Sequence, residues 1–147
     1  TLIQGLDCGP SLTSPPVSEE ARYSGSWYDP DRSGEGYVVQ ILADNSALAY
    51  WFSYDAQGNR RWFFGTGTLV GDSWKFDSMN TTAGPLFGES YNPDDLELLP
   101  WGSLELDLGC DGGEARYTST EAGFGSGSLT VQQLTRMDGP SCPSPQN

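Results

Sequence analysis

The sequence predicts an all-β protein in which about eight antiparallel strands form a meander. Short runs of aromatic and β-branched residues alternate with Gly, Asn and Asp, which is the pattern of strands and turns. No long window shows apolar residues at helical spacing. The 19 glycines and 10 prolines of the 147 residues suit many tight turns. We expect the meander to close, or nearly close, into a barrel, because closure removes exposed strand edges. A two-sheet sandwich is the alternative.

The prediction begins from a hairpin whose two arms, residues 47–54 and 60–65, flank a turn at residues 55–59. Side chains alternate sides along a strand, so Trp51 points away from Tyr50 and Phe52. In the second arm, Trp62 and its neighbour Phe63 likewise face opposite sides. Large rings therefore occupy both faces. The second face is either covered by other parts of the protein or free to contact a ligand.

The other strands follow in order along the chain. We expect them at residues 24–28, 37–42, 68–70, 73–77, 102–108, 114–119 and 128–136. In one of them, Leu104, Leu106 and Leu108 should face the core, with Glu105 and Asp107 outside. Residues 65–67 are expected to be a glycine-rich link between strands. Residues 79–100 are expected to be an irregular insertion, a kind of segment that is often functional or disordered.

These elements belong to one domain. Residues 23–142 form the β domain, residues 1–22 precede it as a Pro-rich arm, and residues 143–147 follow it as a tail. Residues 2–3 of this arm could form a short strand, but its stretch 10–18 cannot hold a helix or a strand ladder, because prolines interrupt it.

The net charge of −13, from 20 acidic and 7 basic residues, limits the partners. Nucleic acid is not expected to bind, because phosphate neutralisation requires clustered Lys and Arg. Anionic lipid surfaces are excluded for the same reason. We expect no membrane insertion, because no apolar run approaches the length of about 18 residues that a helical span requires.

The residue types argue against an enzyme. The chain contains no His, which removes the commonest general base and any Ser-His-Asp arrangement. It also contains no Gly-rich phosphate loop with a following Lys and Ser or Thr. Most acidic residues lie in turns or on outer faces, where carboxylates are solvated. We therefore expect a non-catalytic protein.

One acidic segment resembles the first half of a calcium loop. Asp29, Asp31, Ser33 and Glu35 offer oxygen ligands on alternate residues, and Gly34 occupies the sixth position. The residue at the twelfth position is not the bidentate Glu of an EF-hand, so a true EF-hand is excluded. The alternative is an Asx-type turn with local hydrogen bonds. No cofactor is expected, with calcium at Asp29, Asp31 and Glu35 as the alternative.

The tryptophans suggest a binding surface. Trp51, Tyr54 and Trp62, together with Trp27, could line a concave aromatic site for a carbohydrate or a small apolar ligand. The alternative is that they fill the barrel. A second hypothesis is a structural subunit of an extracellular oligomer or fibre, in which residues 1–22 add to a neighbouring copy and drive self-assembly.

The three cysteines, Cys8, Cys110 and Cys142, lack the close paired spacing of zinc sites. Disulfide bonding in a secreted protein fits this composition better than metal ligation does. Because three is an odd number, one thiol is left free or pairs with another chain.

Several motifs together resemble a domain of exported proteins of Gram-negative bacteria that has no assigned function. They are GSWYDPDRSGEGY at 25–37, YWFSYD at 50–55, WGSL at 101–104 and GSGSL at 125–129. The resemblance covers roughly residues 24–142 and implies export and a β fold. It also implies a Cys110–Cys142 bridge, which would leave Cys8 free or intermolecular; a Cys8–Cys142 bridge is the alternative. A weaker likeness to avidin-type barrels supports the barrel. We therefore expect a bacterial protein that is secreted or at the cell surface, with the periplasm as an alternative.

Overall fold

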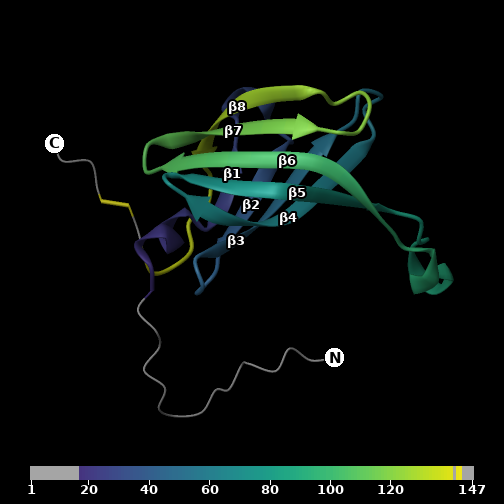
Figure 1. Cartoon of the computed structure of the whole chain (residues 1–147), viewed down its shortest axis with the longest axis horizontal. Helices are drawn as coiled ribbons and strands as arrows, with labels where there is room; N and C mark the ends of the chain where they lie inside the picture. The colour runs from purple at the N-terminus through teal and green to yellow at the C-terminus, as the bar shows by residue number, and fades with distance from the viewer. Residues whose placement is uncertain (1–16, 141, 144–147) are drawn as a thin grey trace, which may run out of the picture.

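The computed structural model describes residues 17–140 and 142–143, and it is a closed barrel of eight antiparallel strands (Figure 1). The strands are β1 (Gly25–Tyr28), β2 (Gly36–Ile41), β3 (Ser46–Tyr54), β4 (Arg60–Val70), β5 (Ser73–Ala83), β6 (Glu97–Gly109), β7 (Gly112–Ser119) and β8 (Ser126–Gln133). Four short 3₁₀ turns accompany them: η1 (Glu19–Tyr23), η2 (Pro30–Arg32), η3 (Gly88–Ser90) and η4 (Pro93–Asp95). In the described ranges, no helix is long and apolar enough to cross a membrane. The predicted all-β meander and its closure are confirmed, and the sandwich alternative is wrong.

The barrel closes where β8 returns to β1. Trp27 pairs with Gln133 across this seam. The Gln133 side-chain amide donates to the carbonyl oxygens of Arg22 at 3.0 Å and Ser24 at 3.2 Å. Part of the predicted 1–22 arm, in η1, is therefore bonded to the barrel wall, whereas residues 1–16 lie outside the described residues.

The interior is filled by side chains that alternate inward along each strand. An aromatic group lies at its centre, with Phe63 stacked on Trp101 at a centroid distance of 4.2 Å and Trp51 edge-on to Trp101 at 5.4 Å. As predicted, Leu104 and Leu106 are buried. The barrel is thus a packed core, and its outer surface carries the residues that are free to contact other molecules.

The expected link at residues 65–67 is wrong, because these residues continue β4. Gly65 and Gly67 face the barrel interior and are both buried. A Cβ at Gly67 would lie 2.4 Å from the Lys75 carbonyl oxygen, and one at Gly65 would lie 2.8 Å from the Met79 sulfur. The glycines leave room for the neighbouring strand to pack closely, so their role is spacing within a strand.

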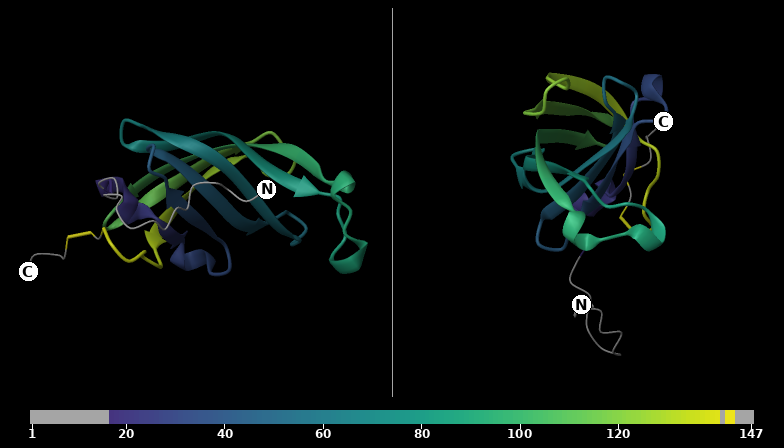
Figure 2. Two further views of the ribbon diagram at one scale, coloured as in Figure 1. Left: turned by 90° about the horizontal axis from the view of Figure 1, so that it is seen from below. Right: turned by 90° about the vertical axis from the view of Figure 1, so that its right-hand side faces the viewer.

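Residues 79–100 are more regular than expected. Strand β5 continues to Ala83, β6 begins at Glu97, and only residues 84–96 are irregular. β4 last pairs with β5 at Asn80, and β7 first meets β6 at Gly102, so the segment between them pairs only with itself. It projects from the barrel as a ribbon with a folded tip, seen from two sides in Figure 2. We call residues 82–100 the β5–β6 arm.

Cys110 and Cys142 form a disulfide with a Cα–Cα distance of 5.5 Å, which confirms the pairing that the resemblance implies. The bond ties the segment after β8 to the turn between β6 and β7. The alternative Cys8–Cys142 bridge is therefore wrong, and Cys8 itself lies outside the described residues.

Candidate ligand-binding surface

The four residues predicted to bind a ligand fall on opposite sides of the barrel wall. Trp27 and Trp51 point into the core and are 1% and 4% exposed, whereas Tyr54 and Trp62 lie outside and are 46% and 39% exposed. Residues 51 and 54 differ by an odd number of positions, so strand alternation already places them on opposite faces. Trp27 and Trp51 are therefore part of the barrel packing and not of an outer surface.

The outer face of the β3–β4 hairpin carries four aromatic rings, of which only Trp62 is among the residues predicted to bind a ligand. We call Tyr50, Phe52, Trp62 and Phe64 the outer aromatic cluster. In the strand register, Tyr50 lies opposite Phe64 and Phe52 lies opposite Trp62. The Tyr50 ring stacks on those of Phe52, Trp62 and Phe64 at centroid distances of 6.4, 6.2 and 6.2 Å. In the sequence, the rings of each strand are two residues apart, at 50 and 52 and at 62 and 64, and this spacing places them on the same face.

The rings of the cluster hold one another in place. Trp62 and Phe64 have centroids 5.0 Å apart and an interplanar angle of 22°, which is offset stacking. Because each ring packs against a neighbour and each is rooted in a strand, little side-chain freedom is left to lose on binding. The cluster is therefore a preorganised apolar surface, although Phe52 and Trp62 remain 48% and 39% exposed.

A groove runs along the end of this cluster, and its volume is about 500 Å³. Its lining consists of Gly34, Phe52, Ser53, Tyr54, Arg60, Arg61 and Trp62. We call it the Phe52–Trp62 groove. The Tyr54 hydroxyl donates to the Gly34 carbonyl oxygen across it at 3.4 Å. The groove thus combines ring walls with polar groups, as small-ligand sites do.

The two arginines that line the groove differ in whether their guanidinium groups are paired with a carboxylate. Arg61 makes two hydrogen bonds of 2.8 Å to the carboxylate of Glu121, and its guanidinium lies over the rings of Phe63 and Phe124. The pKa of Arg61 is raised by the bonded Glu121 carboxylate. Arg60 is exposed and forms no ion pair within the part of the chain that the structure describes. Its guanidinium donors are therefore available to a ligand.

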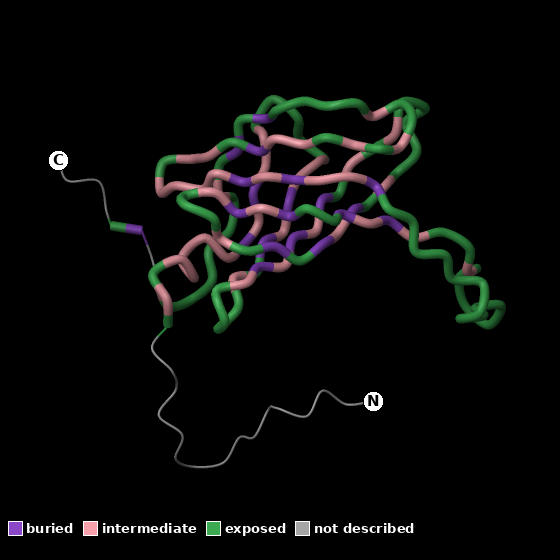
Figure 3. The backbone as a smooth tube through the Cα atoms, in the orientation of Figure 1, coloured by how far each residue is buried: buried purple, intermediate pink, exposed green. Residues whose placement is uncertain are grey.

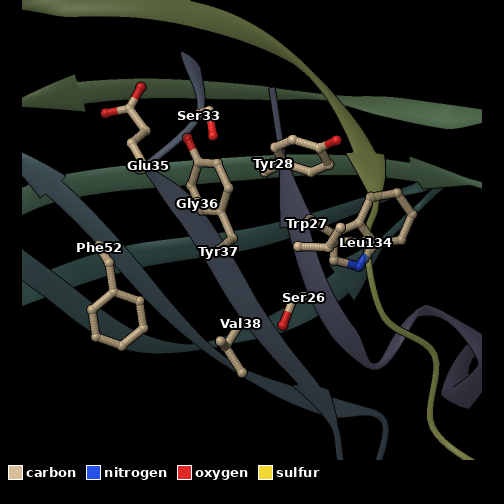
Figure 4. A pocket seen from close by; sticks show the side chains of 11 residues that line it. Ser26, Trp27, Tyr28, Ser33, Glu35, Gly36, Tyr37, Val38, Phe52 and Leu134 are labelled. Atoms are coloured by element: carbon tan, nitrogen blue, oxygen red, sulfur yellow. The ribbon is translucent and has the colours of Figure 1, made fainter. Parts of the chain in front are cut away.

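A second hollow, of about 430 Å³, adjoins the groove and shares Phe52 and Gly34 with it (Figure 4). Small outward residues on β1 and β2, among them Ser26 and Gly36, leave this space. At Gly36 a Cβ would lie only 2.8 Å from the Trp27 carbonyl oxygen. Phe52 is thus a ridge between two adjoining depressions.

The predicted calcium residues are arranged as a turn. The Asp29 side chain accepts a hydrogen bond from the Asp31 backbone N–H at 3.0 Å and begins η2. Glu35 pairs with Arg32 at 3.1 Å and accepts a bond from the Ser53 hydroxyl. Within the described residues, no three side chains of the types Asp, Glu, Cys or His converge as metal ligands do. The geometry is that of the Asx-type alternative.

Three polar atoms inside the barrel have no hydrogen-bond partner among the described residues. They are the Tyr37 hydroxyl and the indole nitrogens of Trp51 and Trp101. Tyr37 stacks on Trp51 at 5.0 Å, so all three belong to the central aromatic group. Burial raises the pKa of Tyr37 far above its ordinary value, which keeps the phenol neutral. These atoms lie within the core and are separate from the outer groove.

A charged network covers the outer face of β5, β6 and β7. Arg116 is its centre, with Glu105 at 2.6 Å, Asp107 at 2.7 Å and Glu114 at 2.9 Å. Hydrogen bonding to Arg116 lowers the pKa of Glu105, and bonds from Ser73 and Arg116 lower that of Asp107. The charged groups of this network are thus paired with one another.

No known protein family, curated protein or solved structure matches the chain.

Proposed function

We propose that this protein is an exported, non-catalytic binding module and that the Phe52–Trp62 groove binds a carbohydrate or a small apolar ligand. The single observation that carries the proposal is the preorganised outer aromatic cluster bordering that groove. Rings this exposed cost free energy in water unless a ligand covers them, and patches of this kind mark binding sites.

The groove offers complementary contacts for a sugar. The apolar C–H face of a pyranose ring can pack on Phe52 or Trp62. Hydroxyl groups of the sugar can accept hydrogen bonds from the Arg60 guanidinium. They can also donate a hydrogen bond to the Tyr54 hydroxyl or accept one from it. A purely apolar ligand would use the rings alone. Sensitivity of binding to Arg60 therefore separates the two ligand classes.

Export is supported by the disulfide, because such bonds persist mainly in oxidising compartments. The resemblance to exported bacterial domains points the same way, to a secreted or cell-surface location with the periplasm as an alternative. A non-catalytic role is supported by the absence of His from the sequence.

The alternative function, a structural subunit that assembles through residues 1–22, remains a prediction. Residues 1–16 lie outside the described residues, and η1 is bonded to the protein's own barrel. The described part of the segment therefore favours attachment to its own chain.

Isothermal titration calorimetry with a panel of neutral oligosaccharides tests the proposal. We expect Trp62→Ala to weaken binding of the best ligand by at least about tenfold, because truncating a central aromatic contact costs more than 1 kcal/mol. Val70→Ala is the matched control, since Val70 is exposed on the same strand and does not line the groove. Equal affinity of Trp62→Ala and the wild type would contradict the proposal.

A further inference from the structure

The β5–β6 arm exposes more apolar surface than the folding of this chain requires. Its large apolar side chains are at least 40% exposed: Leu86, Phe87, Tyr91, Leu96, Leu98 and Leu99. Phe87 is 102% exposed, so its ring touches almost nothing in its own chain. In Figure 3 the arm is exposed along almost its whole length. Several large apolar side chains exposed on one projecting element indicate a docking element.

The tip of the arm is held in one shape by local hydrogen bonds. The Asn92 side chain accepts a bond from the Asp94 backbone N–H at 3.1 Å and caps η4. The backbone N–H of Tyr91 donates to Gly88 at 3.0 Å, and that of Leu96 donates to Pro93 at 3.2 Å. The apolar side chains are therefore presented by an ordered scaffold, which lowers the entropy cost of docking.

The charges of the arm and of the groove are opposite. The arm contains four acidic residues and no basic one: Glu89, Asp94, Asp95 and Glu97. The lining of the Phe52–Trp62 groove contains two arginines and no acidic residue, and because Arg61 is paired with Glu121, Arg60 supplies the unpaired positive charge among the described residues. Such complementarity steers association and selects the partner.

The arm and the groove lie at the same end of the barrel. β5 runs antiparallel to β4, so the arm leaves the barrel beside the start of β4, where Arg60 and Trp62 line the groove. Figure 1 shows the arm projecting past that end, and the left view of Figure 2 shows it standing clear of the barrel. One two-fold axis beyond this end can therefore place each arm over the groove of the other copy.

We propose that the β5–β6 arm of one copy docks into the Phe52–Trp62 groove of a second copy, with Phe87 between the aromatic walls, in a symmetric pair. This pairing is linked to the proposed function because the arm and the proposed ligand would occupy the same groove. A docked arm covers the ligand site, so ligand and second copy compete. Each arm is narrow, and the contact is of the small, transient class.

Sedimentation velocity on the full chain without ligand, from about 10 μM to about 1 mM, tests the pairing over the affinity range of weak interfaces. We expect a concentration-dependent dimer in the wild type. Phe87→Ser should weaken it at least about tenfold, as loss of a hot-spot residue does. Met137→Ser is the matched control, because Met137 is 64% exposed outside the arm and should leave the dimer unchanged.

A charge exchange identifies the groove as the partner of the arm. We expect Arg60→Glu alone, and Asp94→Arg with Asp95→Arg, each to weaken self-association. An equimolar mixture of the two variants should restore a dimer, because the reversed arm then faces the reversed groove. Near-ultraviolet circular dichroism identical to that of the wild type shows that each variant is folded.

A monomer at every concentration, or a Phe87→Ser variant that associates like the wild type, would overturn the inference. A dimer that needs Phe87 but ignores Arg60→Glu would place the arm elsewhere and overturn the groove assignment. Calorimetry on Phe87→Ser separates the two proposals, since this variant keeps the groove. Sugar binding without any dimer refutes the pairing alone, whereas a dimer without sugar binding refutes the ligand function alone.

Discussion

Replacing Phe63 by Ala removes the ring at the centre of the barrel core. Phe63 is 0% exposed; it stacks on Trp101 at 4.2 Å and meets Trp51 and Phe124 edge-on at 5.6 and 5.4 Å. Large-to-small changes of a buried Phe cost about 3–5 kcal/mol. Lost aromatic pairs add about 0.5–1.5 kcal/mol each, so we expect the upper part of that range, about 4–5 kcal/mol.

The neighbouring Trp62 provides the control, because it is larger but lies on the outer face. Its ring keeps 39% of its surface exposed and packs mainly on Phe64 and Tyr50. We expect Trp62→Ala to lower the free energy of unfolding by only about 1 kcal/mol. Urea unfolding of both variants, with m-values equal to that of the wild type, measures the difference. A loss below about 1.5 kcal/mol for Phe63→Ala, or an equal loss for both variants, would refute the two-faced hairpin.

Three further predictions concern stability. Removing the disulfide by Cys110→Ser with Cys142→Ser should cost about 3–4 kcal/mol, because the bond closes a loop between residues 32 positions apart; urea unfolding with no loss would contradict this. Glu105 and Asp107, which both pair with Arg116, have lowered pKa values in the folded state, so their stabilisation is present at neutral pH and is lost as the pH falls below about 4. Arg116→Gln should flatten the fall in Tm between about pH 5 and pH 2, and an unchanged acid profile would exclude the network as its source. Gly67→Ala should lower the free energy of unfolding by about 1–3 kcal/mol, because its Cβ would lie 2.4 Å from a carbonyl oxygen of β5; an unchanged Tm would contradict this packing.

Most of the barrel was accessible from the sequence because strand alternation is a local signal. Leu104 and Leu106, two residues apart in one strand, were predicted to face inward and are buried. Closure followed from the need to protect strand edges. The disulfide was implied only by the family resemblance, because the spacing of three cysteines does not identify a pair.

Features that depend on distant residues were not accessible. Gly65 and Gly67 resemble a flexible link in the sequence, since nothing near them shows that atoms of β5 lie within 3 Å of where a Cβ at either position would be. The arm looked irregular because a ribbon that pairs only with itself lacks the apolar alternation that a barrel imposes. Of the four residues predicted to bind a ligand, Tyr54 and Trp62 lie on the outer face, whereas Trp27 and Trp51 are buried, because a tryptophan in the sequence does not by itself show which face it occupies.

The ligand-binding claim is tested most directly by following the five indole N–H signals of ¹⁵N-labelled protein by NMR during an oligosaccharide titration. Trp62 is the exposed indole, whereas the other four are at most 4% exposed. We predict that the Trp62 signal shifts in a saturable manner and that the signals of the buried indoles stay in place. Shifts at Trp51 and Trp101 with Trp62 unmoved would place binding inside the barrel, and the outer groove would then not be the site.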